Sequence, residues 1–173
     1  LLGGPLEVTT NAARALADIN YDPPANPLAP GGQGDWPKLP GKREMVDLSR
    51  PAAPMAASAY LHDYPALAWA AVRRLDNSIA AALSWEAASF PCAWLWYELE
   101  GTPEPPWHGR GRMLGIEPNT TRSGSGLADA KARGTGLLTL EPGAELSTEL
   151  RLHVFEPKGR VTGVTVDGRA ATG

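Results

Sequence analysis

Short stretches rich in apolar residues follow one another along most of the chain, and most are followed closely by glycine, proline, asparagine or aspartate. Stretches of this length with such endings favour β-strands. Many of them in succession are typical of an all-β sandwich or barrel with antiparallel strands. We expect strands at Glu44–Leu48, Ala57–Tyr64, Leu67–Leu75, Ile79–Trp85, Cys92–Leu99, Arg112–Glu117, Leu137–Leu140, Glu145–Phe155 and Val161–Val166.

The clearest alternation of apolar and polar residues runs from Glu145 to Phe155. A period of two predicts a half-buried antiparallel strand with one solvated face. His153 belongs to the polar set, so we expect a solvated surface histidine. The set expected on the buried face is Leu146, Thr148, Leu150, Leu152 and Val154.

The stretch Leu67–Leu83 is rich in alanine, which suits a helix, but Asp76-Asn77 interrupts it. We therefore expect two strands joined by a turn, and a second hairpin turn at Asp167-Gly168. The one helix that the pattern favours is Leu127–Arg133, which ends before Gly134.

Glycine and proline number 19 and 17 in 173 residues, and this density argues against a helical bundle. They concentrate in residues 22–42, which carry almost no hydrophobic periodicity. We interpret 1–173 as a single domain with long Pro/Gly loops. Residues 1–43 would form a loop-rich opening segment and 44–173 a strand-rich core.

Charge and cysteine content exclude several function classes. Sixteen Lys and Arg against 19 Asp and Glu give a net charge of −3 without a basic run, which disfavours nucleic-acid binding. No stretch approaches the ~20 apolar residues of a membrane span. The single Cys92 excludes an internal disulfide and a cysteine-based zinc site, and the three histidines lack metal-ligand spacing. We expect a cytoplasmic domain with neither metal nor cofactor.

Aromatic residues cluster around the stretch Cys92–Leu99. Trp94 and Trp96 lie two residues apart, so they share one face of a strand, whereas Leu95 and Tyr97 take the other face. Exposed tryptophans can stack on the apolar face of a sugar ring. Composition alone favours the alternative that these tryptophans fill the core.

Glu117 is the strongest candidate for acid–base chemistry. It ends an apolar run and precedes a loop of small polar residues suited to hydroxyl recognition. A carboxylate that ends a buried strand is poorly hydrated, as a general base often is. The alternative is a structural ion pair with Arg110 or Arg112.

The run Arg112-Met-Leu-Gly-Ile-Glu117-Pro-Asn-Thr-Thr, followed by Gly134 and Leu140-Glu-Pro-Gly143, resembles the C-terminal half of aldose 1-epimerases, the galactose mutarotase-like proteins. Trp36-Pro37, Val46-Asp-Leu-Ser49 and Phe90-Pro91 upstream of Trp94 are also similar to this family. The resemblance covers residues 36–156 and implies part of a β-supersandwich. It also implies interconversion of the α and β anomers of a free aldose, with Glu117 as the base.

Within that resemblance, the candidate substrate-binding residues are Trp94, Trp96, His108, Asn119 and Arg112. The family's acidic histidine lies in an N-terminal motif that residues 1–35 do not match, so we expect that part of the domain to be missing. His62 is a candidate replacement acid, and His108 is another.

Two other interpretations of the function are possible. One is a carbohydrate-binding sandwich without catalysis, and the other is an interaction domain. A sandwich cut in this way would expose a sheet edge through which the chain could self-associate.

Overall fold

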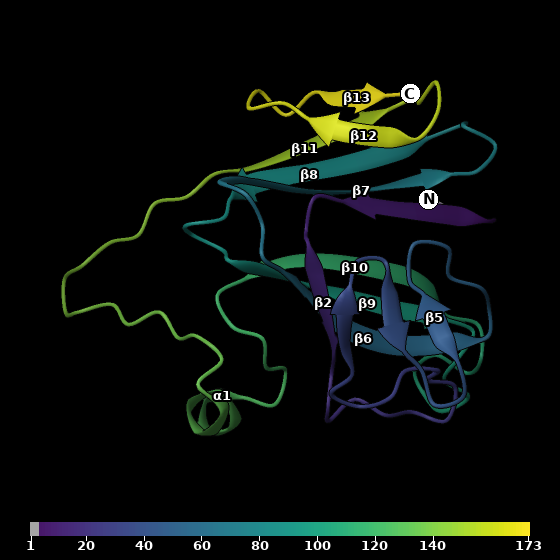
Figure 1. Cartoon of the computed structure of the whole chain (residues 1–173), viewed down its shortest axis with the longest axis horizontal. Coiled ribbons are helices and arrows are strands. Elements are labelled where there is room, and N and C mark those ends of the chain that lie inside the picture. Colours follow the sequence, from purple (N-terminus) through teal and green to yellow (C-terminus); the bar gives the residue numbers. More distant parts are fainter. Residues whose placement is uncertain (1–3) are drawn as a thin grey trace.

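Two antiparallel sheets form the body of the protein in a computed structural model that describes residues 4–173 (Figure 1). Sheet A has the strand order β1-β7-β8-β11, and sheet B has the order β10-β9-β6-β2-β3. The strands of sheet A are β1 (Leu6–Thr10), β7 (Leu67–Arg74), β8 (Ala80–Glu86) and β11 (Leu150–Phe155). The strands of sheet B are β2 (Arg14–Ala17), β3 (Gln33–Asp35), β6 (Met55–His62), β9 (Cys92–Leu99) and β10 (Arg112–Asn119).

Two small hairpins and one helix complete the described chain. The hairpins are β4 (Lys38–Pro40) with β5 (Met45–Asp47), and β12 (Val161–Val164) with β13 (Ala170–Thr172). The helix α1 (Leu127–Arg133) lies on the long excursion that links β10 to β11 (Figure 1). No helix within residues 4–173 is long and apolar enough to cross a membrane.

The main core lies between the two sheets, because every second residue of their central strands points inward. Ala93, Leu95 and Tyr97 of β9 face Val72 and Trp85 of sheet A in one buried cluster. The hairpin β12–β13 covers the outer face of sheet A and encloses a smaller cluster around Trp69. The fold is therefore an all-β sandwich, as the pattern of short apolar stretches predicts.

Several local predictions are confirmed. Leu67–Leu83 forms β7 and β8 joined by a turn in which Asn77 has a φ of 59°. The strand Cys92–Leu99 has the predicted bounds, and so has the helix Leu127–Arg133. Gly134 ends the helix in the left-handed conformation, with φ 59° and ψ 38°.

The opening segment is richer in strands than its glycine and proline content indicates. Residues 4–43 contain β1, β2, β3 and β4. β1 lies at the edge of sheet A and pairs with β7, and β2 pairs with β6 inside sheet B. Both sheets therefore include strands from the first 43 residues.

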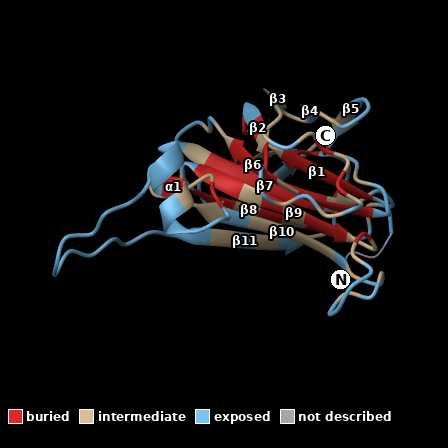
Figure 2. Ribbon diagram, turned by 90° about the horizontal axis from the view of Figure 1, so that it is seen from below, coloured by how far each residue is buried: buried red, intermediate tan, exposed pale blue. Residues whose placement is uncertain are grey.

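The predictions for residues 137–155 need the largest correction. Residues 137–149 contain no strand, so the strand expected at Leu137–Leu140 is absent. The alternating strand exists only as β11, and its burial is the reverse of that predicted. Leu150, Leu152 and Val154 are exposed, because β11 is an edge strand whose inner face is left open (Figure 2).

The side chains on the opposite face of β11, which include His153, are more buried than the apolar set. His153 is half-buried under the hairpin β12–β13, where its Nδ1 accepts a hydrogen bond from the Ala170 amide at 3.3 Å. Its ring stacks on Phe155 with 4.7 Å between the ring centroids. The prediction of a solvated His153 is therefore wrong.

Candidate functional site

The outer face of sheet B carries the aromatic residues that the sequence singles out. Trp94 of β9 is paired in register with Tyr60 of β6 and with Glu117 of β10. Trp96 is paired one step along with Ser58 and Gly115. Because residues two apart on a strand share a face, Trp94 and Trp96 stand side by side on this surface.

The two indole rings are held in place by hydrogen bonds at their edges. Trp94 Nε1 donates to the carbonyl oxygen of Thr121 at 2.6 Å, and Trp96 Nε1 donates to Tyr21 Oη at 3.1 Å. Trp107 packs against Trp96 with ring centroids 5.8 Å apart. The side chains of Trp94 and Trp96 are half-buried, so they do not fill the core. They form a fixed, partly open aromatic surface.

A cleft of about 320 Å³ lies over these rings. Loops around residues 18–21 and 123–125 line it together with the sheet. Its lining mixes aromatic, hydroxyl, amide and carboxylate side chains. The lining residues are Asp18, Asn20, Tyr21, Ser58, Trp94, Trp96, Glu117, Gly124 and Ser125.

Asp18 is the buried carboxylate of this cleft, with only 7% of its surface exposed. Its Oδ2 accepts a hydrogen bond from Tyr60 Oη at 2.5 Å, and its Oδ1 accepts one from the backbone N–H of Asn20 at 2.8 Å. The Gly124 amide in turn donates to Tyr60 Oη at 3.0 Å. Burial, followed by the hydrogen bond to Asp18, raises the pKa of Tyr60 well above its ordinary value. The phenol therefore stays protonated and donates to Asp18.

Glu117 is the second carboxylate of the cleft and is exposed, which corrects the expectation that it is buried. It is not ion-paired with Arg112, whose guanidinium binds Glu100 at 2.5 Å. The absence of a side chain at Gly115 makes room for it, because a Cβ there would lie 2.7 Å from Glu117 Oε1. The Glu117 carboxylate is thus accessible to a ligand and also to solvent.

Three other sequence candidates lie outside the cleft. Arg112 lines a different cavity, and His108 is exposed on the turn before β10 with a φ of 49°. His62 is on the outer face of sheet B, but its Nδ1 lies 3.0 Å from Asp63 Oδ1 and it does not line the cleft. The histidines are therefore not brought together with Glu117.

Asn119 lies on the outer face of sheet B beyond Glu117, and its side chain has a local partner. Its Oδ1 accepts a hydrogen bond from the Thr121 amide at 3.2 Å. Cys92, which is paired with Asn119 in register, is buried, and burial raises the pKa of its thiol to about 12. These residues shape the loop that holds Trp94.

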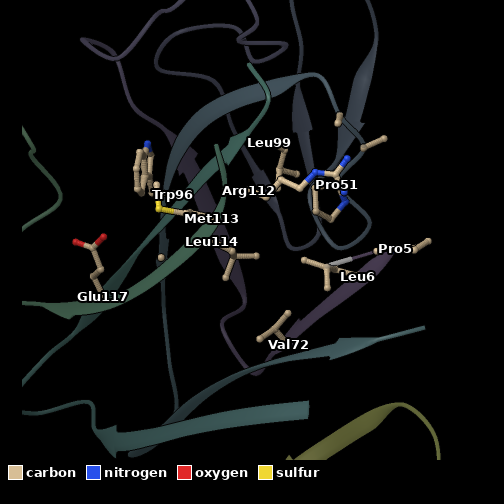
Figure 3. A pocket seen from close by; sticks show the side chains of 14 residues that line it. Pro5, Leu6, Pro51, Val72, Trp96, Leu99, Arg112, Met113, Leu114 and Glu117 are labelled. Carbon is tan, nitrogen blue, oxygen red and sulfur yellow. The ribbon is translucent and has the colours of Figure 1, made fainter. Parts of the chain in front are cut away.

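A larger cavity of about 860 Å³ opens between the sheets beneath β10. Figure 3 shows Leu6, Leu114 and Val72 close together in it, whereas Trp96 and Glu117, which also line it, lie apart from these three. Its lining is mostly apolar, so it suits a sugar poorly. Among residues 4–173, no group of three or more His, Cys, Asp or Glu side chains could hold a metal ion.

The sequence does not predict the part of the cleft that comes from the opening segment. Asp18 and Asn20 follow β2, a strand of only four residues that lies just before the glycine- and proline-rich residues 22–42. Ser58 and Tyr60 lie in a predicted strand, but nothing in the sequence shows that they neighbour Trp94 and Trp96. The short apolar run Ala15-Leu-Ala17 is the one signal that points to a strand leading to Asp18.

Comparisons with models of known protein families, with well-characterised proteins and with solved structures find no match.

Proposed function

We propose that the protein binds a carbohydrate in the cleft on the outer face of sheet B. The observation that carries the proposal is the pair of fixed, half-open rings of Trp94 and Trp96 within a cleft that also contains Asp18 and Glu117. The C–H face of a pyranose stacks on an aromatic surface, and carboxylates accept hydrogen bonds from its hydroxyl groups. A cleft of about 320 Å³ has the size of a small-ligand site.

A second candidate function is aldose 1-epimerase activity, favoured by the carboxylate of Glu117 at the cleft and by the sequence around it. In this reaction Glu117 would take the proton from the anomeric hydroxyl while an acid protonates the ring oxygen. The C1–O bond to the ring oxygen then breaks, the aldehyde end rotates, and the ring closes on the other face. None of the three histidines lines the cleft. Binding is for that reason the better-supported function.

Sugar binding is tested by titrating tryptophan fluorescence with glucose and galactose. We expect saturable quenching or enhancement in the wild-type protein and its loss in Trp96→Ala. Met45→Ala, which removes an exposed apolar side chain from β5, serves as the control and should titrate like the wild type. If no mono- or oligosaccharide changes the fluorescence, the proposal fails.

Epimerase activity is tested by polarimetry on freshly dissolved α-glucose and α-galactose. We expect the wild type to speed the approach to anomeric equilibrium and Glu117→Gln to lose at least ~100-fold of that rate, the usual contribution of a positioned base. Glu145→Gln, an exposed change outside the cleft, is the control. Equal rates for wild type and Glu117→Gln on every aldose would remove the catalytic role.

A further inference from the structure

We propose that the cleft selects an amino sugar, with the pyranose ring on Trp94 and Trp96 and the ammonium group at Asp18. The proposal rests on the carbohydrate-binding function above and adds the chemical class of the ligand.

The charge of the cleft favours a cationic ligand. Two of its lining residues are carboxylates, and no lysine or arginine lines it. Two cations on neighbouring segments are engaged elsewhere, since Arg133 pairs with Asp129 at 2.8 Å and Lys42 pairs with Asp22 at 2.6 Å. A ligand that brings a positive charge is therefore favoured over a neutral one, and a phosphate or carboxylate on the sugar would be repelled.

Asp18 is held in a way that suits a charged hydrogen-bond donor. It is almost completely buried, so its interaction with a nearby charge is screened less than that of a surface group. The Tyr60 hydroxyl and the backbone N–H of Asn20 each use one acceptor position, on Oδ2 and Oδ1 respectively. A carboxylate has about four such positions. Asp18 can thus accept further hydrogen bonds from the ligand without losing its anchors.

The aromatic lining around the carboxylates also favours a cation. Trp94, Trp96 and Tyr21 all line the cleft, and the hydrogen bond between Trp96 and Tyr21 fixes two of these rings relative to each other. Cations are attracted to the faces of such rings, most strongly to tryptophan. The same walls that stack on a sugar ring therefore also favour an ammonium group attached to it.

The experiment compares four ligands by fluorescence titration of the wild-type protein at a pH where the amine is protonated. The ligands are glucosamine, glucose, N-acetylglucosamine and glucose 6-phosphate. We expect glucosamine to bind at least ~10-fold more tightly than glucose and N-acetylglucosamine, and glucose 6-phosphate to bind most weakly. Raising the pH until the amine is neutral should remove the preference, which requires no variant protein.

Asp18→Asn should reduce the preference for glucosamine to less than ~2-fold while circular dichroism confirms the fold. Asp35→Asn, an exposed change on β3 away from the cleft, should keep it. If Asp18→Asn does not fold, the pH titration of the wild type decides. Equal binding of glucose and glucosamine, or tighter binding of glucose 6-phosphate, would overturn the inference and leave carbohydrate binding intact. If none of the four ligands or other sugars binds, the proposed function itself fails.

Discussion

Gly124 offers a change that should separate ligand binding from stability. It lies on the loop that lines the cleft, and a methyl group there would be 3.3 Å from Asp18 Oδ2 and 3.5 Å from Tyr60 Oη. Its backbone is not in the left-handed region, so alanine fits the local conformation. Gly124→Ala would therefore narrow the cleft beside its buried carboxylate without straining the chain.

This geometry predicts a large effect on sugar affinity and a small one on the free energy of unfolding. A methyl group misplaced in a binding pocket costs about 1–3 kcal/mol, so we expect sugar affinity to fall by about 10- to 200-fold. Replacing a glycine by alanine at a compatible position restricts the unfolded chain and stabilises a protein by about 0.4–1 kcal/mol. The close contact with Asp18 offsets part of this gain, so the free energy of unfolding should stay within ~1 kcal/mol of the wild type.

Both quantities are measurable on the same samples, by fluorescence titration with sugar and by urea denaturation. Gly163→Ala is the matched control, because a Cβ at Gly163 on β12 meets no atom within 4 Å. The control should leave affinity unchanged. Wild-type affinity in Gly124→Ala would show that this part of the cleft does not hold the ligand, and the reasoning would be refuted.

Three further changes test other parts of the account. Burial alone would raise the pKa of Glu7, but hydrogen bonds from Arg73 and Arg50 outweigh it and lower that pKa. The stabilising effect of the Glu7 carboxylate should therefore be complete above about pH 4.3 and be lost as the pH falls through the lowered pKa. Glu7→Ala should cost about 3 kcal/mol in urea denaturation at pH 7 and much less near pH 2. Leu152→Ala should cost less than ~1 kcal/mol, because that side chain is 70% exposed, and a loss of 2 kcal/mol or more would show that β11 is covered. Gly115→Ala should displace the Glu117 carboxylate and weaken sugar binding while leaving the thermal midpoint nearly unchanged; unaltered binding would separate Glu117 from the ligand.

Local features of the fold follow from the sequence where the signals lie close together along the chain. The strand Cys92–Leu99 and the helix Leu127–Arg133 are predicted with their bounds, because alternation, alanine content and a terminal glycine act over a few residues. The burial of β11 is not predicted correctly. Alternation shows that its two faces differ, but only the position of a strand within its sheet decides which face is covered.

The candidate site divides in the same way. Trp94, Trp96 and Glu117 are found from the sequence because they lie on the two paired strands β9 and β10 near recognisable turns. Asp18 is not found, because its place in the cleft depends on the pairing of β2 with β6, about 40 residues away along the chain. The proposed selection for a positive charge likewise depends on two carboxylates that share one cleft, which the sequence does not show.

The central claim is that sugar binds over Trp94 and Trp96, and the indole N–H signals in a ¹H–¹⁵N NMR titration test it most directly. Each of the six tryptophans gives one such signal. Sugar should shift the signals of Trp94 and Trp96 progressively, and should leave that of Trp85, which is buried and hydrogen-bonded to the Phe90 carbonyl, in place. Signals of Trp94 and Trp96 that do not move at high concentrations of glucose, galactose or glucosamine would contradict the account.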